Sequence, residues 1–296
     1  MGLVEDAKIL LSEEKHRIAL HDLVVAETKK TAALLTAGHF PIQGAAGSNE
    51  EFISRVGRYE TAVADLMKLQ SLLGYWAGAM NEAALTLAPR RLADEVRPES
   101  GLVIWNSLRW YPIFLLLYAT GVAATAARRY DNLRLILHAP VIDPERSRAR
   151  LPLVRSVVRG LQDAAGYFKQ LPGLENHRVP LNDHVFALLL TLLDDLLLLG
   201  TDYETAFDDF EILMALQHAD LYSTEPSGRA WGPLGRFAWK FHSADMTSPF
   251  HRLLAESQRD GPAWPPIRAG MFQGSIERFR EIATSFGKTI TTLGWY

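Results

Sequence analysis

The sequence predicts an all-α protein, on three observations. Apolar residues recur three or four positions apart over most of the chain, which is the period of a helix buried along one face. Alternating β-branched runs, which are typical of strands, are scarce, and the nearest, at 154–158, has flanks that suit a helix. Gly, Pro, Asn and Asp separate the periodic stretches. We expect about ten helices, packed as helical hairpins in an irregular bundle or a short solenoid-like array.

The first elements follow from this period and its interruptions. Residues 3–37 have the pattern of one long amphipathic helix, which Gly38 ends. Ser48 is a suitable N-cap for a second helix that runs to about Tyr75. A shorter helix at 79–88 is expected to stop before the next residue, a proline, because proline breaks a helix interior.

The most apolar part of the chain lies within Trp105–His138. Its run from Pro112 to Ala127 has about 16 residues, fewer than the ~20 that span a bilayer. The run at 184–199 is of similar length and carries two central aspartates, each of which costs ~2.5–3.5 kcal/mol in a membrane. We therefore expect two helices buried on nearly all sides of a soluble core, and no membrane association.

The remaining elements are read in the same way. Residues 139–152 are rich in Pro and Arg and predict a linker, a weak lobe boundary within what we expect to be a single large helical domain over residues 1–296. Further helices are expected at 184–199, 202–221 and 275–293, with loops at 171–180, 223–235 and 260–270.

A short phrase recurs around Tyr59, Tyr130 and Tyr203, at separations of 71 and 73 residues. In the second and third copies a long apolar helix precedes a tight turn, and the tyrosine opens the next helix. This order is typical of helical hairpins, as in tetratricopeptide-like arrays. Chance recurrence of a common helix start also explains the phrase, so we predict hairpins packed side by side and not a regular solenoid.

Charge is segregated along the chain. Residues 128–159 hold eight arginines against three acids, whereas residues 181–220 hold nine acids and no Lys or Arg. Guanidinium groups bind phosphate in a forked geometry, so one interpretation is a nucleic-acid-associated subunit that uses Arg128–Arg159. The other interpretations are that the two segments pair with each other inside the fold, or that both are solvated helix faces.

The acidic segment also suggests a metal site. If the two helices are antiparallel neighbours, Asp194 or Asp195 could face Asp208 or Asp209 and hold a divalent cation, as in a metal-dependent hydrolase. The segment lacks a Glu-x-x-His pair or a histidine at metal-ligand spacing. Capping, solvent exposure and salt bridges are therefore the competing interpretation of these carboxylates, and we predict no metal.

Composition excludes several other kinds of chemistry. The chain has no cysteine, which excludes disulfides, thiolate zinc sites and cysteine nucleophiles, and fits a reducing, cytoplasmic compartment. The net charge of −3 does not favour a polyanion binder by bulk electrostatics. The glycines at 44–47 lack the Gly-Lys-Ser/Thr ending of a phosphate-binding loop and follow no strand, and we predict no cofactor. The first residues lack the basic start and apolar run of a signal peptide.

Five phrases together resemble a helical C-terminal region of uncharacterised bacterial proteins. They are Arg55–Glu60, Leu108–Pro112, Arg129–Leu133, Trp231–Trp239 and Trp264–Gly270. In those proteins the region tends to follow a sirtuin-like (SIR2-like) or AlbA-like domain, and several of the proteins resemble anti-phage defence components. The chain shows no such N-terminal domain, so the resemblance implies either a stand-alone version with a separately encoded partner or a fragment. No catalytic residue carries over.

We therefore expect a non-enzymatic helical interaction or scaffold module of a bacterial multi-component system, with a protein partner or a second copy of itself. Trp and Arg are the favoured anchors of such interfaces, although aromatic residues in loops also fill cores. The candidate interaction residues are Arg146, Arg148, Arg150, Arg155, Arg159, Trp231, Arg236, Trp239 and Trp264.

Overall fold

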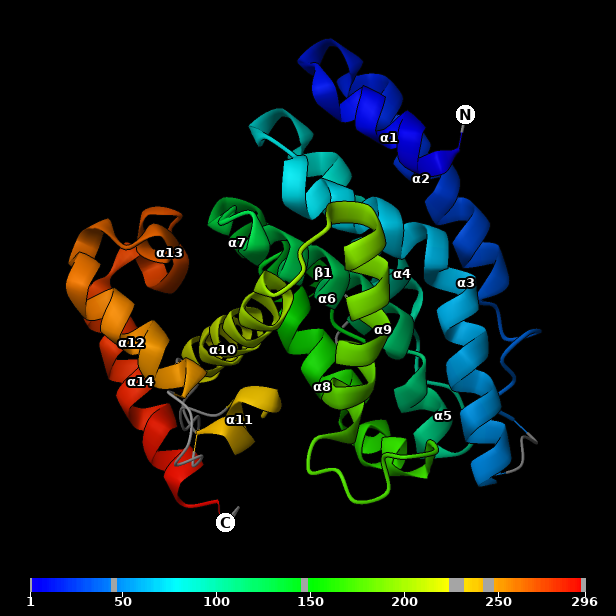
Figure 1. Cartoon of the computed structure of the whole chain (residues 1–296). Helices are drawn as coiled ribbons and strands as arrows, with labels where there is room; N and C mark the ends of the chain where they lie inside the picture. Colours follow the sequence, from blue (N-terminus) through cyan, green and yellow to red (C-terminus); the bar gives the residue numbers. More distant parts are fainter. Residues whose placement is uncertain (1, 44–46, 145–148, 224–231, 242–247, 294–296) are drawn as a thin grey trace.

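The computed structural model describes residues 2–43, 47–144, 149–223, 232–241 and 248–293 (Figure 1). Helices make up most of the described chain, and two three-residue strands are its β-structure, so the all-α prediction is confirmed. The α-helices are α1 (Leu3–Ser12), α2 (Arg17–Leu34), α3 (Asn49–Trp76), α4 (Glu82–Glu95), α5 (Val103–Leu108), α6 (Tyr111–Ala126), α7 (Tyr130–Leu137), α8 (Leu153–Ala165), α9 (Pro180–Leu197), α10 (Asp202–Ser223), α11 (Arg236–Lys240), α12 (Pro249–Asp260), α13 (Pro265–Arg268) and α14 (Ile276–Thr291). The strands are β1 (Pro140–Ile142) and β2 (Arg150–Pro152), and the 3-10 helices are η1 (Glu14–His16), η2 (Ala79–Asn81), η3 (Gly166–Gln170), η4 (Gly261–Ala263) and η5 (Met271–Gly274).

Helix α6 is the centre of the core. Every residue from Tyr111 to Thr125 is buried, because the run has no polar face to present to solvent. The helix packs chiefly along α3 and is crossed by α10. A Cβ on Gly121 would lie 2.0 Å from the Phe210 ring, so only glycine allows this approach of α6 to α10. No helix in the described ranges is long and apolar enough to cross a membrane.

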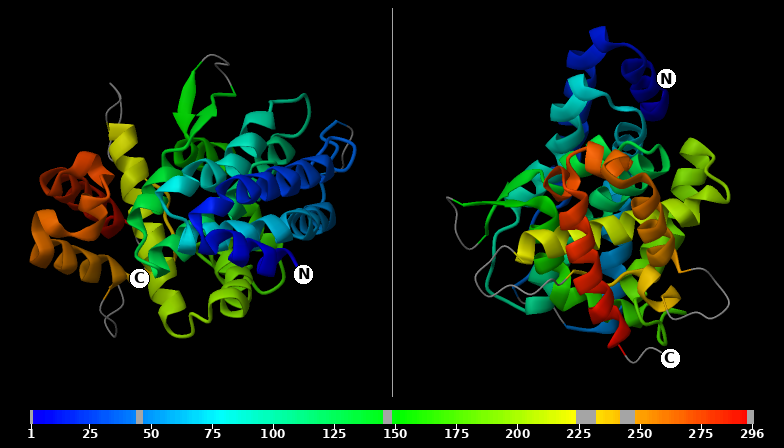
Figure 2. Two further views of the ribbon diagram at one scale, coloured as in Figure 1. Left: turned by 90° about the horizontal axis from the view of Figure 1, so that it is seen from above. Right: turned by 90° about the vertical axis from the view of Figure 1, so that its left-hand side faces the viewer.

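The remaining helices surround this centre on two sides. Helices α12, α13 and α14 gather at the far end of α10, on the left of Figure 1, while α1 and α2 lie at the opposite side of the molecule (Figures 1 and 2). Buried apolar side chains from Ala7 in α1 to Ile290 in α14 nevertheless belong to one continuous core.

Two predicted helix boundaries are wrong. The single helix expected at 3–37 is two helices, because Glu13 is extended and η1 follows it. The polar run from Ser12 to His16 has nothing to bury, and the break lets both helices pack on α3. Pro89 lies inside α4 instead of ending it. Its ring is buried, and packing of the neighbouring apolar residues outweighs one lost backbone hydrogen bond.

The segment 139–152, predicted as a linker, contains a β-hairpin. Val141 pairs with Leu151 in antiparallel register, and the backbone N–H of Ile142 donates to Asp94 Oδ1 of α4 at 2.6 Å. Arg150 donates to the other oxygen of the same carboxylate at 3.2 Å. The hairpin is therefore attached to the core through α4, and these short strands were not expected from the sequence.

Two of the recurring tyrosines lie at helix starts. Tyr130 is the first residue of α7, and Tyr203 lies in the first turn of α10. Tyr59 lies in the middle of α3, where no turn precedes it. The predicted order, in which a helix and a short connection precede a tyrosine at the start of the next helix, is therefore found at α6–α7 and α9–α10 but not at the first copy. That these helices pack as hairpins stays a prediction.

Candidate interaction sites

The acidic face of α10 has its basic partners in the C-terminal part of the chain. Lys240, a buried residue of α11, donates to Asp208 at 2.5 Å and to Glu204 at 2.7 Å. Arg252 of α12 pairs with Asp209. Arg278 of α14 donates to Asp220 at 2.6 Å. These ion pairs attach α11, α12 and α14 to α10.

The sequence hypothesis that residues 181–220 pair with the arginines of 128–159 is therefore wrong for these carboxylates. Their partners are Lys240, Arg252 and Arg278, which all follow α10 in the chain. Two described arginines of the earlier segment pair elsewhere: Arg129 with Asp131 at 3.2 Å, and Arg150 with Asp94 at 3.2 Å.

A buried carboxyl group lies at the centre of the α6–α9–α10 contact. Glu211 Oε1 accepts from Asn182 Nδ2 at 2.6 Å and from the Tyr118 hydroxyl at 3.2 Å, and its Oε2 accepts from the Arg236 backbone N–H at 2.6 Å. Burial raises the pKa of Glu211 to about 8, although the Asn182 and Arg236 hydrogen bonds act in the opposite direction. A Cβ on Gly235 would lie 2.2 Å from Glu211 Oε2, so this backbone can approach the carboxyl only without a side chain. The contacts join four segments, which is a structural role.

The predicted aromatic anchors lie in different surroundings. Arg236 pairs with Asp183, stacks on Phe186 with its guanidinium carbon 3.8 Å from the ring centroid, and is mostly buried. Trp264 is 1% exposed and packs on Phe279, so it fills the core. Trp239 is 36% exposed. Trp231 lies outside the described residues.

The predicted arginines are not brought into one described patch. Arg146 and Arg148 lie outside the described residues. Arg150 is on β2, where it holds the hairpin to α4. Arg155 and Arg159 are on α8, one turn apart.

The carboxylates of the suggested metal site are also separated. Asp194 accepts the backbone N–H of Gly200 at 3.3 Å and so stabilises the turn after α9. Asp208 and Asp209 contact Lys240 and Arg252. Within the described ranges there is no group of three or more His, Asp or Glu residues arranged to hold a metal ion.

Sequence reasoning missed an apolar groove between α1, α3 and α9. The ends of these helices lie together at the top of Figure 1 and enclose a space of about 550 Å³. Its lining residues are Lys8, Leu11, Ser12, Tyr75, Trp76, Leu196 and Leu197. Trp76 is 55% exposed, and Leu198, next along the chain, is 84% exposed. Such large apolar side chains normally lie inside a protein, so their exposure at one place is informative.

The α9 wall of this groove departs from the sequence expectation. We expected 184–199 to be buried on nearly all sides, but α9 is buried along one face only, and Leu190 is 42% exposed. Leu198 has a left-handed backbone with φ of 53°, which turns the chain at the groove. The signal that could have located the groove is the pair Tyr75-Trp76, which ends a helix with aromatic residues on adjacent faces.

Two carboxylates precede the α9 residues that line the groove, without lining it themselves. Asp194 and Asp195 lie exposed in the last turn of α9, which has no basic residue and carries the negative end of the helix dipole. The described cation in the lining is Lys8, whose ammonium donates to the Leu196 carbonyl at 3.5 Å.

Comparison of the chain with protein-family models, with curated proteins and with solved structures finds no match.

Proposed function

We propose that the chain is a non-enzymatic helical interaction module that works in the bacterial cytoplasm and binds a protein partner in the α1–α3–α9 groove. The observation that carries this proposal is the half-exposed Trp76 beside an apolar space of about 550 Å³. Tryptophan is among the residues that contribute most to binding energy at protein interfaces.

The partner that fits is an amphipathic helix with a basic flank. Grooves between helix ends bind the apolar face of such a helix through anchors spaced three or four residues apart. The carboxylates of Asp194 and Asp195 would attract its basic flank, which makes association faster at low salt and weaker at high salt.

The resemblance to helical regions of anti-phage defence proteins supports a partner encoded nearby. In that setting the module would join a separately encoded component to the rest of the assembly. A second copy of the chain is the other occupant to test.

The test is mass photometry of the purified chain, alone and mixed with the products of its neighbouring genes. We expect one neighbour to form a complex, and Trp76→Ala to weaken its Kd by roughly 30-fold, the effect of losing about 2 kcal/mol. Tyr167→Ala is the control, because it removes a half-exposed aromatic side chain outside the groove and should leave the Kd unchanged. A chain that stays monomeric and captures no neighbour, or equal losses in the two variants, would contradict the proposal.

A further inference from the structure

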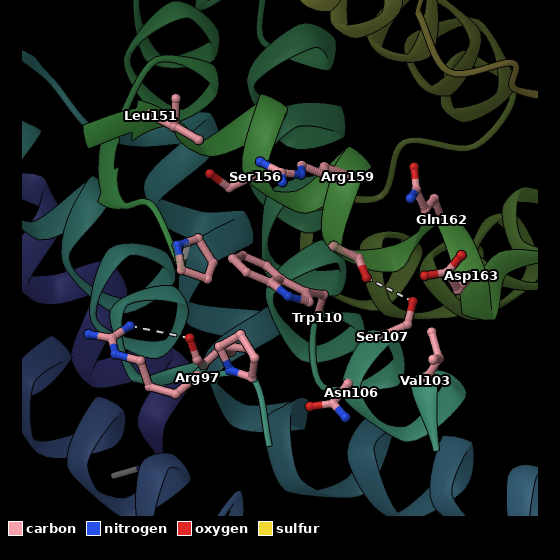
Figure 3. A pocket seen from close by; sticks show the side chains of 14 residues that line it. Arg97, Val103, Asn106, Ser107, Trp110, Leu151, Ser156, Arg159, Gln162 and Asp163 are labelled. Atoms are coloured by element: carbon pink, nitrogen blue, oxygen red, sulfur yellow. Dashed lines mark hydrogen bonds between the residues drawn. The ribbon is translucent and has the colours of Figure 1, made fainter. Parts of the chain in front are cut away.

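A second pocket, of about 360 Å³, lies between α5, α8, β2 and the segment that precedes α5 (Figure 3). Its size falls in the range of small-molecule sites. Trp110, Val103 and Leu151 form apolar walls, while Ser156, Arg159 and Asp163 of α8 contribute polar groups. This mixture of apolar walls and a few polar groups is typical of a ligand pocket.

The informative residue in this pocket is Ser156. Its side chain is buried, the residue being 3% exposed, and its hydroxyl has no hydrogen-bond partner among the described residues. Burying a hydroxyl without a partner is unfavourable, and a helical serine normally avoids this by donating to the carbonyl one turn earlier. Ser156 therefore has an unused donor in the wall of a pocket.

A positive charge lies beside this hydroxyl. Arg159 is three residues further along α8, so both side chains project from the same side of the helix. Figure 3 shows the Arg159 guanidinium next to Ser156 on one wall, with Arg97 on the wall opposite. Arg159 also interacts elsewhere in the chain, but a guanidinium has five N–H donors and can bind a ligand as well. A hydroxyl donor beside a guanidinium favours an anion.

The other lining residues indicate what the uncharged part of the ligand should be. The Trp110 ring lies across the middle of the pocket, between Arg97 and Arg159, and offers an apolar surface (Figure 3). Asp163 lies at the end away from Leu151. Its carboxylate would repel an anion and accept a hydrogen bond, so the charged end of a ligand belongs near Ser156 and a donor group belongs near Asp163.

We propose that this pocket binds a small organic anion. Ser156 and Arg159 hold its carboxylate or phosphate group, Trp110 contacts a flat apolar body, and Asp163 accepts a hydrogen bond from the far end. This site is independent of the α1–α3–α9 groove, so either proposal can fail without the other.

The experiment is calorimetric titration of the full chain with adenosine monophosphate, with 4-aminobenzoate and with inorganic phosphate. The first two carry an anion, an aromatic body and a donor, and they separate phosphate from carboxylate. We expect at least one of them to bind saturably with a Kd below about 1 mM, and phosphate alone to bind more weakly because it lacks the body. Ser156→Ala and Arg159→Gln should each weaken that binding roughly tenfold or more.

Two controls separate a ligand site from a structural effect. Arg91→Gln removes one positive charge from an exposed position of α4 outside the pocket and should leave binding unchanged. Ser156→Ala should not lower the melting temperature of the ligand-free protein, because the hydroxyl it removes has no partner there. The proposal is overturned if neither organic anion binds, if phosphate binds as tightly as they do, or if Arg91→Gln weakens binding as much as Arg159→Gln.

Discussion

At the scale of single residues, the buried carboxyl of Glu211 makes stability depend on pH. Burial raises its pKa from an ordinary 4.5 to about 8, so the folded protein binds a proton here that the unfolded chain releases. The stabilisation is complete below pH 4.5 and is lost as the pH rises towards about 8. Asp209, whose pKa burial raises to about 6, acts in the same direction over a lower range.

We expect Glu211→Gln to remove part of this dependence. An amide keeps the shape and does not titrate, but its single oxygen can replace only one of the two accepting carboxyl oxygens, so the variant also loses some stability that does not depend on pH. Melting temperatures recorded from pH 5 to pH 8 should fall less steeply in Glu211→Gln than in the wild type, whose free energy of unfolding changes by up to about 1.4 kcal/mol per pH unit from this group. Glu14→Gln, at an exposed position, is the control. Parallel curves for the wild type and Glu211→Gln would show that Glu211 is ionised throughout.

Several residue roles could not be predicted from the sequence. Arg and Trp are the residue types that most often anchor interfaces, which is why Arg236 and Trp264 were candidates. In the structure, however, Arg236 pairs with Asp183 and stacks on Phe186, and Trp264 is in the core. Whether such a residue anchors an interface or fills the core depends on neighbours more than 10 residues away in sequence, as Phe279 is from Trp264. Local composition contains no such information.

At the scale of elements, prediction was most accurate where a sequence pattern is compatible with only one environment for the helix. Helix α6 has no polar face, so its burial followed from its sequence alone. The break between α1 and α2 was missed because the polar run from Ser12 to His16 contains no Gly or Pro, the residues that usually mark the end of a helix. The β-hairpin was hidden because each of its strands is three residues long, below the length at which alternation is visible.

The contact between α6 and α10 yields a paired prediction on two helical glycines. Gly121→Ala should lower the free energy of unfolding by about 1–3 kcal/mol, since the new methyl group would overlap the Phe210 ring. Gly57→Ala, in α3, has open space around the new methyl group and should raise it by up to about 1 kcal/mol. Urea denaturation measures both values. A Gly121→Ala variant as stable as the wild type would mean that α6 and α10 are further apart than described.

At the scale of the whole molecule, the ion pairs of α10 and the exposed apolar groove lie in different regions. Asp208, Asp209 and Asp220 of α10 pair with Lys240, Arg252 and Arg278, which attach the C-terminal helices to α10. None of the residues in these ion pairs lines the groove at the ends of α1, α3 and α9, whose walls are mostly apolar. The first region is internal structure, and the second is where we propose that a partner binds.

The most direct test of the proposed interaction module is hydrogen–deuterium exchange of the full chain with and without the neighbour that it captures. We expect slower exchange on binding in α1, at the C-terminal end of α3 and in the last turn of α9, which are the segments that line the groove. Exchange in α12–α14 should be unchanged. Protection confined to α12–α14, with none at the groove, would contradict the proposed mode of binding.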